Sequence, residues 1–370
     1  MRIERIRVAR VPLVLVSPLR TSDGAHQSRS AVLVEITDSE GFVGWGENVA
    51  TSGVAYVGES AEASYAAMTQ LLIPELVQHD VAVADLFADG WWGIEGQHFA
   101  KHAIESALWD VHARRQGKSL AEVLGAVETE IEVGVVVGMH DSIDDVVAEV
   151  MMRVDEGYAR VKVKIAPGHD VEVLAAVRDA VGIEYALQAD ANGAYSASDI
   201  DLLCSFDSFA LQFIEQPFAA HDLDSHRQLS QRCATSVCLD ESVMTTAQLL
   251  TALDLGACDV VNIKPSRVGG IREAIAMHDV LVERGVDAWV GGMLETGIGR
   301  ASCLALASMP GFTLTPDLSA SSRYFQRDVT TPFVLDDGCL PVPQGTGIGV
   351  EPLAEVLAEE NVVIETVFEP

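Results

Sequence analysis

The chain has 370 residues, of which 49% are hydrophobic and 21% charged, a composition that excludes an intrinsically disordered protein. Its 55 acidic and 24 basic residues give a formal net charge of −31, which disfavours binding to nucleic acid or to an acidic membrane surface. No apolar run approaches the roughly 18 residues of a membrane span, and the N-terminal MRIERIRVARVPL is typical of a strand. We therefore expect a cytoplasmic protein that binds neither nucleic acid nor membrane.

The first 125 residues predict an α+β domain. The run AVLVEITDSEGFVGWGE predicts a β-hairpin with its turn at Asp38 to Gly41. The later AKHAIESALWDVHARRQG has the pattern of a helix.

From residue 126 to 320, strand-like runs alternate with amphipathic helical segments, several of which end in glycine as at a helix C-cap. The expected strands are residues 131–138, 160–165, 185–192, 210–217, 236–242, 259–265, 287–294 and 313–319. Eight such units predict a TIM-type (β/α)8 barrel, with an open, doubly wound parallel sheet as the alternative. Residues 321–370 do not continue this rhythm, and we expect them to pack back on the N-terminal domain.

Charged residues recur at the carboxyl ends of the second to sixth expected strands. Lys164, Asp190, Glu215, Asp240 and Lys264 are separated by 26, 25, 25 and 24 residues. Any one of them could be a helix cap or a solvated loop residue, but five in register indicate a site, because the C-terminal mouth of a barrel carries its chemistry.

Three buried carboxylates packed together are unfavourable unless a cation lies among them. A donor set of oxygens alone favours Mg²⁺, or Mn²⁺, over zinc. Lys164 and Lys264 flank this set, and a lysine beside a divalent cation has a lowered pKa, so that it can act as a general base. Lys162, one layer deeper, is expected to support them electrostatically. The alternative is that lysines on this strand guard an exposed edge.

The six cysteines lie in apolar segments without a CxxC pair. We interpret them as small buried hydrophobic residues of a reducing compartment, not as a disulfide framework or a zinc site.

The motifs VKVKI, DANGAY, IEQPF, CLDES, NIKPSRVGG and GGMLETGIGRA, in this order, resemble those of the enolase superfamily. Within its muconate lactonizing enzyme-like subgroup, they are similar to the branch of o-succinylbenzoate synthases and N-acylamino acid (N-succinylamino acid) racemases. The resemblance covers nearly the whole chain, from GWGE to GTGIGVE. It implies a modified (β/α)7β barrel under an α+β capping domain, and a homo-oligomer.

The resemblance also implies roles for individual residues. Asp190, Glu215 and Asp240 would be the metal ligands, and Lys164 and Lys264 the acid/base pair. The residues around them would be Lys162, Asn192, Glu241 and Arg267. Among these, Glu241 would accept a hydrogen bond from Lys264. Substrate would meet capping loops and a barrel loop at Arg20, Ser22, Tyr56, Gly292 and Met293. Arg20 could equally be a surface arginine, and Arg267 could equally cap a loop.

The function implied is that of a Mg²⁺-dependent o-succinylbenzoate synthase. Such an enzyme removes water by syn-elimination from 2-succinyl-6-hydroxy-2,4-cyclohexadiene-1-carboxylate, in menaquinone biosynthesis, through a metal-stabilised enolate. The first alternative is N-succinylamino acid racemase, either as the sole activity or beside the synthase activity. The substrates of both reactions are small carboxylates. The alternative of another class is a barrel that binds a metabolite without chemistry. Ser266 and Gly193 depart from the residues usual in relatives, glycine and serine, which puts substrate specificity in doubt.

Overall fold

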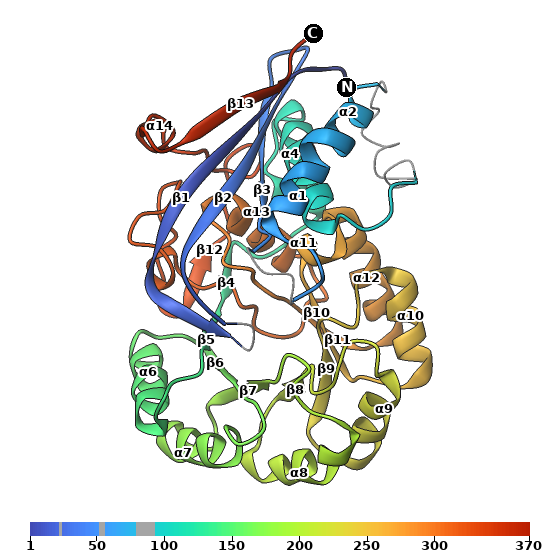
Figure 1. Ribbon diagram of the computed structural model, residues 1–370, viewed down its shortest axis with the longest axis vertical. Helices are drawn as coiled ribbons and strands as arrows, with labels where there is room; N and C mark the ends of the chain where they lie inside the picture. The colour runs from blue at the N-terminus through green and yellow to red at the C-terminus, as the bar shows by residue number, and fades with distance from the viewer. Residues whose placement is uncertain (22–23, 52–55, 79–92) are drawn as a thin grey trace.

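Two large sheets organise the part of the chain that the structure, a computed structural model, describes: residues 1–21, 24–51, 56–78 and 93–370 (Figure 1). The first is a four-stranded antiparallel sheet in the order β13-β1-β2-β3. Its strands are β1 (Ile3–Thr21), β2 (Gly24–Asp38), β3 (Val43–Asn48) and β13 (Val363–Phe368). Because β13 pairs with β1, the last strand of the chain lies in the N-terminal sheet.

Helices pack against this sheet and share a core with it. They are α1 (Ala61–Ala67), the π-helix η1 (Met68–Leu72), α2 (Ile73–Leu76) and α4 (His98–Arg115). The predicted turn between β2 and β3 is confirmed, with Gly41 N donating to Asp38 O at 3.0 Å. Strand β3 lies directly on α4. The two backbones are so close that a Cβ atom at Gly46 would be 2.0 Å from the carbonyl oxygen of Ala103.

The second sheet is a curled parallel sheet of seven strands in chain order, from β5 to β11. Its strands are β5 (Gly134–Val137), β6 (Arg160–Lys164), β7 (Ala186–Asp190), β8 (Phe213–Glu215), β9 (Ser236–Leu239), β10 (Val260–Ile263) and β11 (Asp287–Val290). The predicted TIM-type architecture is confirmed, and residues Gly182, Gly256 and Gly285 end their helices as predicted.

Helices surround the curled sheet on its outside (Figure 1). They are α6 (Ile143–Asp155), α7 (Val171–Val181), η2 (Ala197–Asp199), α8 (Ile200–Ser205), η3 (Phe206–Phe209), α9 (Leu223–Arg232), α10 (Thr246–Leu255), α12 (Ile271–Arg284) and α13 (Gly297–Ala307). The short helix α11 (Pro265–Val268) follows the end of β10 and contacts α4 of the capping part. The remaining short elements are α5 (Leu120–Leu124), β4 (Glu130–Glu132), η4 (Ser321–Arg323), β12 (Cys339–Pro341) and α14 (Ala354–Leu357).

The expected eighth strand, residues 313–319, is not a regular strand. This segment still joins the two edges of the curled sheet, since Asp317 N donates to Val290 O of β11 and Gly134 N of β5 donates to Pro316 O. Pro316 has no N–H group, so the segment cannot complete a ladder. The prediction of residues 131–138 as one strand was also wrong, because β4 leaves the barrel and pairs with β12.

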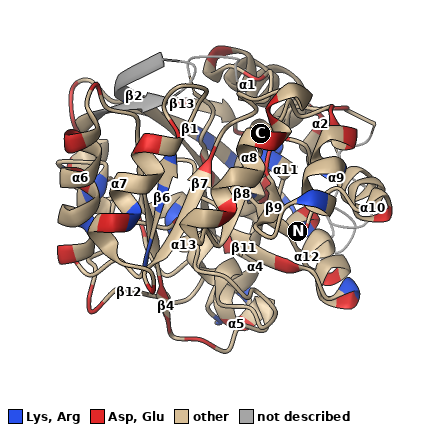
Figure 2. Ribbon diagram, turned by 90° about the horizontal axis from the view of Figure 1, so that it is seen from below, with Lys and Arg blue, Asp and Glu red and all other residues tan. Residues whose placement is uncertain are grey.

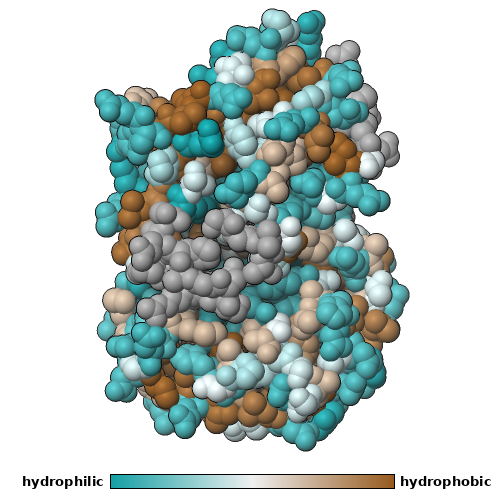
Figure 3. All heavy atoms as spheres, viewed as in Figure 1, coloured by the Kyte–Doolittle hydropathy of each residue, from teal (hydrophilic) through white to brown (hydrophobic). Residues whose placement is uncertain are grey.

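The surface is consistent with the acidic composition. Acidic residues are spread over the outer helices and loops (Figure 2). Hydrophilic residues cover most of the face in Figure 3, with apolar residues scattered between them. In the described part of the chain, no helix combines the length and the apolar character needed to cross a bilayer.

The cysteine prediction is only partly correct. Cys238, Cys258 and Cys303 are buried, as expected. Cys204, Cys233 and Cys339 are partly exposed, because they lie at helix ends or in a short outer strand.

Candidate active site

Five charged residues meet at one rim of the barrel. Lys164, Asp190 and Glu215 are the last residues of β6, β7 and β8. Asp240 and Lys264 directly follow β9 and β10. Lys164 is in register with Asp190, and Asp190 with Glu215. Because neighbouring strands lie about 4.8 Å apart, the side chains share one mouth, as their spacing predicted.

Lys164 lies on one side of this mouth. Its Nζ donates to Asp190 Oδ2 and to Asn192 Oδ1, both at 2.6 Å. Asn192 has a left-handed backbone with φ of 43° and donates through Nδ2 to Glu241 Oε1 at 2.9 Å. A chain of polar contacts therefore fixes the position of the amine.

Lys264 lies on the other side. Its Nζ donates to Asp240 Oδ2 at 2.8 Å and to the hydroxyl of Tyr56 at 2.9 Å. Arg267, fully buried in α11, also contacts the carboxylate of Asp240. The expected hydrogen bond between Glu241 and Lys264 is absent from the described contacts. Glu241 Oε1 accepts a hydrogen bond from Asn192 instead, and the amine of Lys264 donates to Asp240 and Tyr56.

Lys162 lies one layer deeper, as predicted. Its Nζ is 2.7 Å from Glu215 Oε2, 2.6 Å from Asp317 Oδ2 and 4.7 Å from the ring centre of Trp289. Asp317 also pairs with the buried Arg160. The edge-guard interpretation fails for Lys162, since only 2% of this residue is exposed. Residue-by-residue interpretation of the sequence missed Asp317, although it lies in the eighth segment of the barrel repeat.

Burial and crowding shift the carboxyl groups in opposite directions. Burial, reinforced by the charge of Asp190, raises the pKa of Glu215 to about 7. Burial together with Asp240 and Asp190 raises the pKa of Glu241 to about 8. For Asp240, burial is outweighed by Lys264 and Arg267, which lower its pKa.

The buried amine of Lys264 lies among carboxylates that act on its pKa. Burial lowers the pKa of Lys264, but the negative charges of Asp240 and Glu215 outweigh burial and leave the pKa raised. The lowered lysine pKa was predicted for an amine beside a divalent cation, and it stays a prediction.

The carboxylate oxygens point at ammonium and guanidinium groups as the side chains stand. In the described ranges, no group of three or more His, Cys, Asp and Glu side chains is arranged to hold an ion. Two observations nevertheless fit a cation at this rim. Glu241 Oε2 is buried without a hydrogen-bond partner, and neighbouring carboxylates raise the pKa of both Glu215 and Glu241. The donor set of oxygens alone suits a hard divalent ion.

The capping part closes over the mouth at Tyr56. Its hydroxyl donates to Asp240 Oδ1 at 2.7 Å, and Tyr56 and Met293 both pack against a small apolar cluster of Val49, Ala50 and Phe99. Gly292 lies against the backbone of Asp317, where a Cβ would be 2.4 Å from the carbonyl oxygen. Ser22 and the side chain of Arg20 lie outside the described part of the chain.

A buried ion pair within the capping part contacts the barrel. Arg29 Nη2 donates to Glu47 Oε1 at 2.5 Å. Glu47 also accepts hydrogen bonds from Thr296 N and Gly299 N at the start of α13. Arg29 further contacts the carbonyl of Leu294, next to Met293. In the sequence, Glu47 stood out only as the last residue of the GWGE motif.

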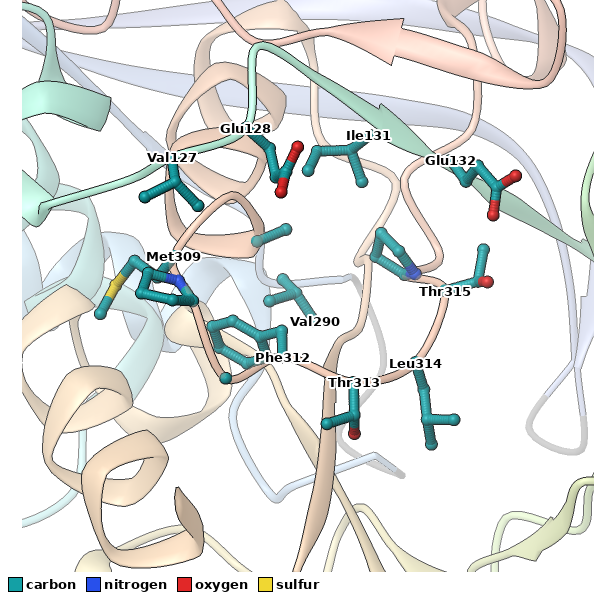
Figure 4. A pocket seen from close by; sticks show the side chains of 14 residues that line it. Val127, Glu128, Ile131, Glu132, Val290, Met309, Phe312, Thr313, Leu314 and Thr315 are labelled. Atoms are coloured by element: carbon teal, nitrogen blue, oxygen red, sulfur yellow. The ribbon is translucent and has the colours of Figure 1, made fainter. Parts of the chain in front are cut away.

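A pocket of about 360 Å³ lies elsewhere, between β4 and the segment from Met309 to Pro316 (Figure 4). Apolar side chains such as Ile131, Val290 and Phe312 line it, with Glu128 and Glu132 among them. None of the predicted site residues belongs to this lining. The chemistry-bearing groups therefore lie at the rim and not in this pocket.

Comparisons with known proteins agree with this arrangement. The mandelate racemase / muconate lactonizing enzyme N-terminal domain model matches residues 3–125, and the enolase C-terminal domain-like model matches residues 145–356. An N-succinylamino acid racemase of Amycolatopsis sp is 42% identical over 97% of each chain. An o-succinylbenzoate synthase of Bacillus subtilis (strain 168) is 40% identical over 94% of each chain.

Solved structures agree as well. A member of the enolase superfamily from Listeria innocua superimposes with a TM-score of 0.94 at 34% identity, covering 100% of both chains. The L-Ala-D/L-Glu epimerase from Bacillus subtilis gives a TM-score of 0.88 at 26% identity, covering 95% of this chain and 99% of that chain. The protein therefore belongs to the enolase superfamily, in the branch that contains o-succinylbenzoate synthases and N-succinylamino acid racemases.

Proposed function

We propose that this protein is an o-succinylbenzoate synthase, which eliminates water from a cyclic carboxylate substrate. The observation that carries the proposal is the placement of two lysine amines, Lys164 and Lys264, at opposite ends of a row of three buried carboxylates on one rim. Several relatives that match over nearly their whole length carry the same name.

Asp190, Glu215 and Asp240 would hold the ion, Mg²⁺ or Mn²⁺. When bound, the ion supplies a positive charge for the substrate carboxylate and for the negative charge that develops as the α-proton leaves. Asp190 and Asp240, which would hold the ion, also accept hydrogen bonds from Lys164 and Lys264, so the two amines would lie next to the ion.

Lys164 would take the α-proton and return it to the departing hydroxyl on the same face, which accounts for syn-elimination. Asn192, which accepts from its Nζ, orients the amine. Lys264 would stay cationic beside the developing charge, with Arg267 and Asp240 fixing its position. Tyr56 and Met293 would cover the substrate from above.

The second candidate function is N-succinylamino acid racemase. The 42% identical relative from Amycolatopsis bears that name. The same geometry supports the reaction, since the two amines lie on either side of the carboxylates. One lysine would remove the α-proton and the other would return a proton from the opposite face. A barrel that only binds a metabolite would have no use for two such amines.

The test offers each substrate to the purified protein with Mg²⁺ and compares kcat/KM for dehydration and for racemisation. We expect the synthase substrate to be dehydrated, and we expect a chelator to abolish and added Mg²⁺ to restore the reaction. Turnover of the N-succinylamino acid alone would refute the synthase proposal. No turnover of either substrate, by a protein that binds them, would favour the metabolite-binding barrel.

A further inference from the structure

Two cysteines on neighbouring outer helices lie in direct contact. Cys204 lies in α8 and Cys233 is the residue that ends α9. The thiol of Cys233 donates to Cys204 Sγ across 2.7 Å, and neither sulfur is in a disulfide. Helices α8 and α9 lie side by side at the foot of the barrel in Figure 1, and both cysteines are partly exposed.

The surrounding contacts hold the two sulfurs together. Asp201 of α8 pairs with Arg232 of α9, one residue before Cys233. On the other side, Asp207 accepts hydrogen bonds from Ala234 N at 3.0 Å and from Thr235 N at 2.7 Å. Because an ion pair and two hydrogen bonds already hold the segments around the two cysteines together, joining the sulfurs costs little further conformational entropy.

The two thiols differ in their environment. Burial, with a contribution from Cys204, raises the pKa of the Cys233 thiol above its ordinary value. The direction of this shift agrees with Cys233 as the S–H donor of the contact. The guanidinium of Arg232 lies close enough to interact with both sulfurs.

We propose that Cys204 and Cys233 are a redox-modification site that closes to an intramolecular disulfide in the presence of a peroxide. The Cys204 thiol gives up its proton and its sulfur attacks one peroxide oxygen. The O–O bond breaks, the sulfur becomes a sulfenic acid, and the departing hydroxide takes up the proton and leaves as water. The Cys233 sulfur then attacks the Cys204 sulfur, and the hydroxyl leaves as a second water. Both sulfurs are oxidised and the peroxide is reduced; a thiol reductant reverses the change.

The bond would join two consecutive β/α units of the barrel, those whose strands end at Asp190 and Glu215. A cross-link between positions 29 residues apart restricts the unfolded chain, so the oxidised protein should be more stable to heat. The inference does not depend on the proposed function, because neither cysteine lies at the mouth.

The experiment treats the whole reduced protein with a small excess of hydrogen peroxide. Free thiols are then counted in denaturant, the intact mass is measured, and cleaved peptides are mapped. We expect the count to fall from six to four, with a mass loss of two hydrogens and one cross-linked peptide pair joining Cys204 and Cys233. Dithiothreitol should restore six thiols.

Matched variants locate the effect. Cys339→Ser removes a partly exposed cysteine outside the pair and should still lose two thiols. Cys204→Ser and Cys233→Ser should form no intramolecular cross-link and lack the oxidation-dependent rise in melting temperature, which should be several degrees in the wild type. Six thiols remaining in the oxidised wild type, or a cross-link mapped to another pair, would overturn the proposal. The wild-type peptide map gives this answer even if a serine variant fails to fold.

Discussion

Replacing Asp317 with asparagine removes one charge from the buried ion pairs beneath the mouth while keeping the size of the side chain. Asp317 is 5% exposed and contacts two cations, Lys162 and the fully buried Arg160. After the change, Lys162 still has Glu215 and Asp190 as partners. Arg160 keeps only Thr315 O and the face of the Trp289 ring among its described contacts.

Two estimates give the range of the loss in unfolding free energy. Leaving a buried ion without its partner costs about 3–5 kcal/mol of folding free energy. Burial raises the pKa of Asp317, but Arg160 and Lys162 outweigh burial and lower the pKa from 3.8 to about 2. That shift corresponds to about 2 kcal/mol of stability. We expect Asp317→Asn to lose about 2–5 kcal/mol of unfolding free energy at pH 7.

Urea unfolding followed by circular dichroism measures this loss, with Asp179→Asn, an exposed aspartate of α7, as the control. The control should change the stability by no more than about 0.5 kcal/mol. A carboxyl group with a lowered folded-state pKa stabilises above its unfolded pKa, and the stabilisation disappears as the pH falls towards the folded value. The difference between wild type and variant should therefore shrink from pH 4 downwards. A loss under about 1 kcal/mol at pH 7, or a difference independent of acid, would refute the reasoning.

Three further changes test other parts of the structure. Lys164→Ala should lower kcat by about 10²–10⁴-fold or more without changing the fold, as checked by steady-state kinetics and circular dichroism. With a chelator present, the unfolding free energy of the wild type should fall as the pH rises from 4.5 towards 8, because an acid with a raised folded-state pKa is destabilising once ionised. In Glu241→Gln, urea titrations should show a smaller fall of the unfolding free energy over this pH range. Glu47→Gln should cost about 3–5 kcal/mol in urea unfolding, because Arg29 loses its buried partner.

Each of these has a contradicting outcome. Full activity in Lys164→Ala would exclude it as the base, and equal pH slopes in wild type and Glu241→Gln would exclude an uncompensated buried charge. For Glu47→Gln, the exposed Glu62→Gln is the matched control, and equal stability of the two would mean that the ion pair with Arg29 is not stabilising.

The repeating part of the fold and the rim could be predicted from the amino-acid sequence. Strand and helix alternate at nearly constant intervals, and parallel strands all end at the same side of the sheet. The positions of Lys164, Asp190, Glu215, Asp240 and Lys264 therefore followed from spacing alone. The glycines at helix ends and the hairpin turn at Asp38 to Gly41 could also be predicted, because they depend on local backbone preferences.

The contacts between side chains became known only from the folded molecule. The pairs Arg160 with Asp317, Arg29 with Glu47, and Cys204 with Cys233 join positions far apart in the chain. No local periodicity encodes such pairs, since they depend on how strands, loops and outer helices meet in space. The same holds for Glu241, which the structure bonds to Asn192, and for residues 313–319, which close the barrel without forming a strand. Burial, too, is a property of the assembled molecule, and it decides which charges need partners and which pKa values move.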